Sequence, residues 1–199
     1  MSAQIPAEFS DTSRFSYYVQ PDFYDELNRL SIAFKQDWPE CDMETFARVQ
    51  GFLSREALLV DNARLNDWLE LFVDDCLYWV PITAGAGDPR YQVSHAFDDR
   101  RRLTDRVYWL RTGLAFSQLP ASRTRRLITN VEATLDEETG ALLVRSNFVI
   151  YEFRAGVTKT YAGWYAHVLR DLGGTLRIQM KQANLLDSEQ VHENLTLVF

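Results

Sequence analysis

Long segments of alternating polar and apolar residues follow Pro120 and constrain the fold more than any other feature of this sequence. Alternation with a period of two is typical of β-strands, and short turns between such segments join antiparallel neighbours. A first strand is expected to turn at 136–140, and later strands are expected over 143–154, 159–170 and 175–186. Sequential hairpins of this length predict a strongly bent antiparallel meander.

Before Pro120, apolar residues recur every three or four positions, which is typical of amphipathic helices. An aspartate at a helix start can cap the first turn, and a glycine can end the last one. Helices are therefore expected after Pro21, from Asp42 to Val60, over 65–72, and from Asp98 or Asp99 to near Gly113.

The period changes from helical to alternating near Asp74 and Asp75, and an aromatic strand is expected over Cys76–Ile82. This pair marks the junction between helix and strand. Adjacent residues of an extended segment point to opposite faces, so the two carboxylates are poor candidates for a catalytic dyad. A cap or an interface ion pair is the favoured use.

These elements define an α+β fold in which N-terminal helices pack in a strongly curved, mostly antiparallel sheet. The resulting cone encloses either a packed core or a pocket. Residues 41–199 are expected to form this single domain, and residues 1–40 an N-terminal arm or extension. Because the first 20 residues are rich in aromatic side chains, we expect them to lie on a protein surface, their own or that of a neighbour.

The formal net charge of −7 argues against nucleic acid or an anionic membrane as a partner. The N-terminus has neither a basic segment nor an apolar one, and no apolar run approaches the roughly 20 residues that span a bilayer. A cytoplasmic protein is expected. The two cysteines, Cys41 and Cys76, are predicted to be reduced thiols.

Metal and nucleotide sites find little support in the sequence. The three histidines, His95, His167 and His192, form neither an HExxH motif nor a His-x-His pair. The loop over 84–90 has two glycines but lacks the third glycine of a dinucleotide-binding turn. No metal site is therefore predicted on this chain.

Two interpretations of the polar residues remain open at this point. In the first, the cone is an enzyme pocket in which one aspartate acts as general base on a small aromatic or steroid-like ligand. Its other polar side chains would come from Tyr78, Tyr91, Tyr161, Tyr165 or His167.

In the second interpretation, a concentration of arginine marks a protein interface, because planar guanidinium groups suit the pairing of carboxylates between subunits. The predicted interface residues are Arg100, Arg102, Arg106, Arg111, Arg123, Arg125 and Arg126, together with Trp79.

From about Phe46 to Phe199 the chain resembles the β (small) subunits of aromatic-ring-hydroxylating dioxygenases, which are Rieske non-haem iron oxygenases. Each matching piece is weak alone, and their order and spacing make the resemblance specific. The pieces are Glu56-Ala57, Leu59, Asp61, Asp67-Trp68-Leu69, Leu71-Phe72, Asp75, Tyr78-Trp79-Val80-Pro81, Ser94-His95, Phe97-Asp98-Asp99, Leu103, Arg106-Val107, Leu110-Arg111-Thr112-Gly113, Pro120, Ser122-Arg123-Thr124-Arg125-Arg126, Asn130-Val131 and Asn194-Leu195.

The resemblance implies a fold like that of nuclear transport factor 2 and scytalone dehydratase, and a non-catalytic role in an α3β3 assembly. It implies that the α subunit carries the Rieske [2Fe-2S] cluster and the mononuclear Fe(II), with NAD(P)H electrons arriving through a reductase and a ferredoxin. A Rieske centre and a facial triad together need at least four histidines, and this chain has three. No cofactor is therefore expected on this chain.

Overall fold

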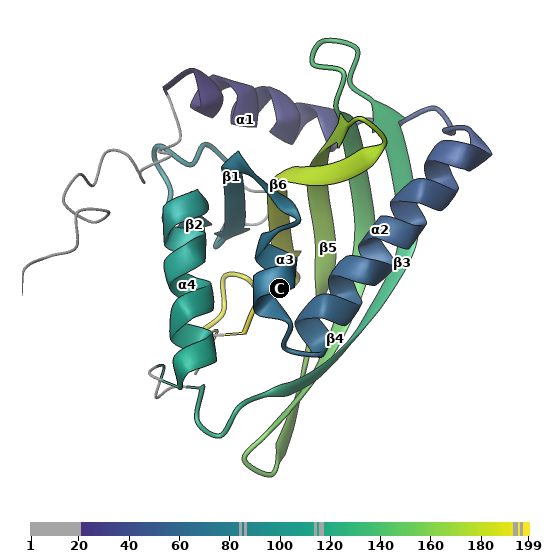
Figure 1. Ribbon diagram of the computed structural model, residues 1–199. Helices are drawn as coiled ribbons and strands as arrows, with labels where there is room; N and C mark the ends of the chain where they lie inside the picture. The colour runs from purple at the N-terminus through teal and green to yellow at the C-terminus, as the bar shows by residue number, and fades with distance from the viewer. Residues whose placement is uncertain are drawn as a thin grey trace, which may run out of the picture.

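The computed structural model describes residues 21–83, 85, 87–113, 115, 118–192, 195 and 197–199. The first 20 residues, for which we expect contact with a protein surface, lie outside this range. Within it, helices and one six-stranded sheet form a curved structure with the C-terminus in its middle (Figure 1).

The sheet confirms the predicted fold class. Its strand order is β2-β1-β6-β5-β4-β3, and β1 and β6 form its one parallel pair. The long strands β3 to β6 follow one another as antiparallel hairpins, in agreement with the alternating segments of the sequence. The strands are β1 Phe72–Pro81, β2 Ser94–Asp98, β3 Arg123–Leu135, β4 Leu142–Arg154, β5 Val157–Leu172 and β6 Thr175–Leu185.

The described residues include four α-helices, which are α1 Pro21–Ala33, α2 Met43–Asp61, α3 Leu65–Leu69 and α4 Arg100–Thr112. Asp99, one of the two predicted caps, accepts a hydrogen bond from the Arg102 amide at the start of α4. Asp42, where a helix was predicted to begin, caps α2 by accepting one from the Thr45 amide. Gly113 ends α4 with a φ of 69°, a left-handed conformation that glycine adopts without steric cost.

The predicted junction at Asp74 and Asp75 is wrong, because α3 ends at Leu69 and β1 begins at Phe72. Both carboxylates lie inside the strand, where its register with β6 shifts between Phe72 and Leu77. Such a bulge interrupts the ladder and allows adjacent side chains to face solvent together. The exposed Asp75 pairs with Arg170 on β5, and its Oδ2 lies 2.7 Å from the arginine Nη2.

Buried side chains lie on both sides of the sheet. The larger cluster fills the side covered by α2, α3 and α4, and the smaller one joins α1 to the opposite side. Strand β1 contributes to both, because Tyr78 faces the first cluster while Leu77 and Trp79 face the second. Leu27 and Leu30 of α1 pack in that second cluster, so residues 21–33 belong to the same packed body.

Strand β2 was not predicted. It has only five residues and forms the edge of the sheet beside β1. Its side chains alternate over too short a span to stand out from the surrounding loop. The pairing with β1 brings Phe97 opposite Trp79, so the second cluster extends to this edge.

Candidate functional site

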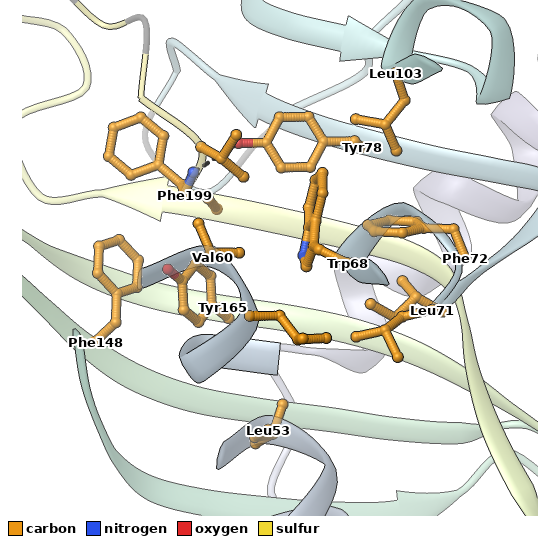
Figure 2. Close-up of a cluster of buried hydrophobic side chains, with 14 of the residues drawn as sticks. Leu53, Val60, Trp68, Leu71, Phe72, Tyr78, Leu103, Phe148, Tyr165 and Phe199 are labelled. Atoms are coloured by element: carbon orange, nitrogen blue, oxygen red, sulfur yellow. Dashed lines mark hydrogen bonds between the residues drawn. The ribbon is translucent and has the colours of Figure 1, made fainter. Parts of the chain in front are cut away.

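The inside of the cone is packed with large side chains. Trp68 of α3 meets Tyr78 of β1 edge to face, with ring centroids 5.9 Å apart, and Tyr165 of β5 stacks on Phe148 of β4 at 4.2 Å (Figure 2). Phe199 lies beside them. All of these side chains are buried, so at this position the cone holds a core.

A charged cluster lies within this core. Glu56 of α2 pairs with Lys181 of β6 through Oε1 and Nζ, 2.6 Å apart, and its Oε2 lies 3.2 Å from Nε2 of His167 on β5. The indole N–H of Trp68 also donates to Glu56 Oε1, at 3.1 Å. All four residues are at most 3% exposed, so solvent does not share in their pairing.

Burial and pairing set the protonation states of this cluster. Burial alone raises the pKa of Glu56, but the nearby Lys181 and His167 outweigh it, and the net pKa falls below its ordinary value. Burial lowers the pKa of His167 and of Lys181, and Glu56 opposes this in both. We therefore assign an ion pair between Glu56 and Lys181 with a neutral His167 beside it.

Because of this cluster, the free energy of unfolding should fall as the pH is lowered. Folding lowers the pKa of His167 below the ordinary 6.5, so the unfolded chain takes up a proton that the folded chain refuses. We expect His167 to reduce the free energy of unfolding by up to about 1.4 kcal/mol per pH unit as the pH falls below 6.5. Glu56 adds to the loss below its ordinary 4.5. Urea unfolding between pH 8 and 5 measures the slope, and an unchanged slope in His167→Gln would contradict this assignment.

The structure brings together only some of the residues of the predicted enzyme pocket. Tyr78, Tyr165 and His167 converge in the core, whereas Tyr91 is 84% exposed on a loop. Burial raises the pKa of Tyr78 to about 12 and that of Tyr165 further, so both hydroxyls stay protonated at neutral pH. The carboxylate among them is Glu56 and not an aspartate, and its partner is a lysine.

Sequence reasoning missed Glu56 and Lys181. One signal was present, because Glu56 lies three residues after Leu53 and four before Val60, on the apolar stripe of its helix. A carboxylate at such a position needs a buried partner. Its partner is 125 positions away in sequence, and no local pattern could have named it.

Three of the predicted interface arginines, Arg100, Arg106 and Arg126, make contacts within the chain, and so does Trp79. Arg126 pairs with Asp61 and donates to the Val198 carbonyl, and its side chain is 2% exposed. The other contacts are from Arg106 to Asp98 at 2.6 Å, from Arg100 to the Leu69 carbonyl at 2.7 Å, and from the buried Trp79 indole to Ser94 at 2.8 Å.

The other four predicted interface arginines lie at the surface: Arg102, Arg111, Arg123 and Arg125. Two of them belong to what we call the β3–β4 patch, formed by Arg123, Arg125, Leu127, Tyr151 and Phe153. In this patch the Arg123 guanidinium lies over the Phe153 ring, 4.7 Å from its centroid. The patch therefore combines exposed aromatic rings with cationic groups on the edge strand of the sheet.

Among the described residues, no group of three or more histidine, cysteine, aspartate or glutamate side chains is arranged to hold a metal ion. A Rieske cluster or a facial-triad iron needs such a set, so the part of this chain that the structure describes does not fit either. In the same part of the chain, no helix is long and apolar enough to cross a bilayer.

Comparison with solved structures places the fold among known cone-shaped proteins. The β subunit of benzoate 1,2-dioxygenase from Burkholderia mallei superimposes with a TM-score of 0.63 at 23% identity, covering 81% of this chain and 100% of that subunit. A Novosphingobium aromaticivorans protein assigned to the scytalone dehydratases gives a TM-score of 0.54 at 12% identity, covering 72% and 85%. The nuclear transport factor 2-like cone is thus confirmed.

Sequence comparison then identifies the family. The model of the ring hydroxylating beta subunit family matches residues 55–191. The small oxygenase component of the p-cumate 2,3-dioxygenase system of Pseudomonas putida is 35% identical over 179 residues, which cover 87% of this chain and 96% of that protein. The chain belongs to the family of ring-hydroxylating dioxygenase β subunits.

Proposed function

We propose that this chain is the structural β subunit of the terminal oxygenase component of an aromatic-ring-hydroxylating dioxygenase in the cytoplasm. It supports assembly of an α subunit, which carries the Rieske [2Fe-2S] cluster and the mononuclear Fe(II) and adds both atoms of O2 to an aromatic substrate. The observation that carries the proposal is the family match together with a cone whose acid–base groups are locked in an internal ion pair.

The assembly we propose is α3β3, with electrons from NAD(P)H reaching the α subunit through a reductase and a ferredoxin. The β subunit contacts copies of itself and the α subunit through surfaces that are rich in arginine. Exposed aromatic rings and arginines are enriched at protein interfaces, and the β3–β4 patch supplies both. Arg102 and Arg111 of α4 are further candidate contacts on different faces of that helix, which also exposes Tyr108 and Trp109.

Co-expression tests the proposal directly. We expect this chain to co-purify with a larger polypeptide that carries Cys-x-His and Cys-x2-His motifs, and to be colourless, iron-free and inactive when produced alone. Absorption bands of an iron–sulfur cluster in the isolated chain would contradict the proposal. An active homo-oligomer with dehydratase or isomerase activity would support the enzyme interpretation instead.

Charge reversal tests the β3–β4 patch. Arg125→Glu places a carboxylate where the proposed interface needs a cation, so we expect subunit affinity to fall at least about tenfold. The folded monomer should persist, because Arg125 is exposed and its hydrogen bonds go to the backbone carbonyls of Thr124 and Asp61. Sizing chromatography over a dilution series measures the affinity.

The matched control is Arg55→Glu, which reverses an exposed charge on α2 outside the patch. It should leave the assembly intact, and circular dichroism should report the same helix and strand content for both variants. A hexamer that survives dilution equally well with Glu at position 125 would remove the patch from the interface.

A further inference from the structure

The last three residues of the chain are buried inside the cone. Leu197, Val198 and Phe199 are 6%, 4% and 2% exposed, and the chain end lies in the middle of the fold (Figure 1). Backbone polar groups that are buried away from water need hydrogen-bond partners.

The amide group between Val198 and Phe199 is bound at both of its polar ends. The Phe199 N–H donates to the Tyr78 hydroxyl oxygen at 2.9 Å, and the Val198 carbonyl accepts from the Arg126 guanidinium. The Arg126 guanidinium is already neutralised by Asp61, so a neutral oxygen suits it. Tyr78 is held protonated by burial, which gives it a pKa of about 12.

The Phe199 ring has its own aromatic surroundings. It meets Tyr161 edge to face, with ring centroids 5.6 Å apart. Its centroid also lies 6.4 Å from that of Phe148, which in turn stacks on Tyr165 (Figure 2). These three partners come from neighbouring strands β4 and β5. Geometry of this kind selects an aromatic ring over an aliphatic group of similar area.

Residues 197 and 198 also border a recess. This recess has a volume of about 110 Å³, and Leu197 and Val198 form part of its wall. The opposite wall comes from α3, α4 and the start of β3, including Leu65, Leu110 and Thr124.

We propose that the cone contains a binding site for a secondary amide that carries an arylalkyl group, and that Val198 and Phe199 of the chain itself occupy this site as an internal ligand. The amide N–H binds Tyr78, the amide oxygen binds Arg126, and the ring packs against Tyr161 and Phe148. Small molecules of the same chemistry take the site when the last two residues are absent.

A chain that ends at Leu197 tests this with N-phenethylacetamide, which has the amide and the ring of the missing residues. Saturation-transfer NMR should show binding to the shortened full-domain chain and none to the unaltered chain at the same concentration. Phenethyl acetate lacks the N–H donor and leaves the Tyr78 oxygen unpaired, so we expect it to bind about three- to tenfold more weakly.

A second variant tests the site without shortening the chain, in case the shortened chain folds poorly. Phe199→Ala removes only the ring and should leave a void that takes benzene, because apolar cavities of this kind bind it. Phe153→Ala, which truncates a partly exposed Phe of β4, should not create such a site. Benzene at ten times its Kd should raise the Tm of Phe199→Ala by about 3 °C.

Three results would overturn the proposal. In the first, the unaltered chain binds N-phenethylacetamide equally well, which would put the site elsewhere. In the second, neither altered chain binds its ligand. In the third, neither altered chain refolds in the presence of its ligand. The test is independent of the proposed subunit role, because none of these measurements depends on assembly.

Discussion

Lys181→Met should lower the free energy of unfolding by about 3–5 kcal/mol, because it leaves Glu56 buried without a counter-charge. Methionine matches the length of the lysine stem, so the change removes the charge with little loss of packing volume. Glu56 would then keep the Trp68 indole as a hydrogen-bond donor, with Nε2 of the neutral His167 lying 3.2 Å from its Oε2. Urea unfolding at pH 7, followed by circular dichroism, measures the effect.

A double variant separates the free energy lost by leaving one charge unpaired from the stabilisation that the intact pair provides, and a second variant serves as a control. Glu56→Gln combined with Lys181→Met removes both charges and should recover most of the lost stability, since replacing a whole buried pair is often neutral. Lys35→Met removes an exposed lysine and should change the unfolding free energy by less than about 0.5 kcal/mol. If Lys181→Met lowers the free energy of unfolding by less than about 1 kcal/mol, the prediction is contradicted, because Glu56 then takes up a proton at little cost.

Trp68→Ala should cost about 3–5 kcal/mol, the range typical of a large aromatic side chain removed from a core. Trp68 is 0% exposed and packs edge to face on Phe72 and Tyr78, with centroid separations of 4.8 and 5.9 Å. Its indole N–H is also a hydrogen-bond donor to Glu56. The same urea unfolding measurement applies.

Trp109→Ala on α4 is the matched control, because that indole is 51% exposed and should contribute within about 0.5 kcal/mol. Trp68→Phe keeps most of the ring but loses the donor, and we expect about 1–3 kcal/mol for the weakened pairing of Glu56. The effects of Trp68→Phe and Lys181→Met should not add, since both act on the same carboxylate. Strict additivity would mean that Trp68 acts by packing alone.

Local signals in the sequence predicted much of the fold. The cap residues Asp42 and Asp99 and the helix-ending Gly113 act within one turn of their own helix, so their positions can be identified without tertiary information. The hairpin turns at 155–156 and 173–174 are equally local, and the alternation between them is long enough to define β4, β5 and β6. These features together determined the α+β class.

The boundary between α3 and β1 was misplaced for a physical reason. The apolar residues of 65–72 keep a helical period, yet Phe72 already pairs with Ile178 of the parallel neighbour β6. A parallel pairing joins segments that are far apart in sequence, and it overrides the local preference. The bulge at Asp74 and Asp75 follows from that pairing and has no sequence pattern of its own.

Arginine content indicated an interface, but the sequence could not separate the arginines that face outward from those that face inward. Arg123 and Arg125 alternate with Thr124 along β3, which places them on one face of the strand, and Arg126 falls on the other. Its tertiary contacts with Asp61 and with the Val198 carbonyl show that Arg126 is used internally.

The sequence by itself determined the α+β class, the cone and the ends of most elements, because these depend on periodicity, caps and turns within a few residues, and its resemblance to known β subunits indicated the family. Tertiary structure decided what the cone contains. Glu56 meets Lys181 across 125 positions, and the chain end returns to Tyr78 across 121. Such contacts arise when distant segments close on one another, and they make the inside of this cone a core with a charged pair and a bound terminus.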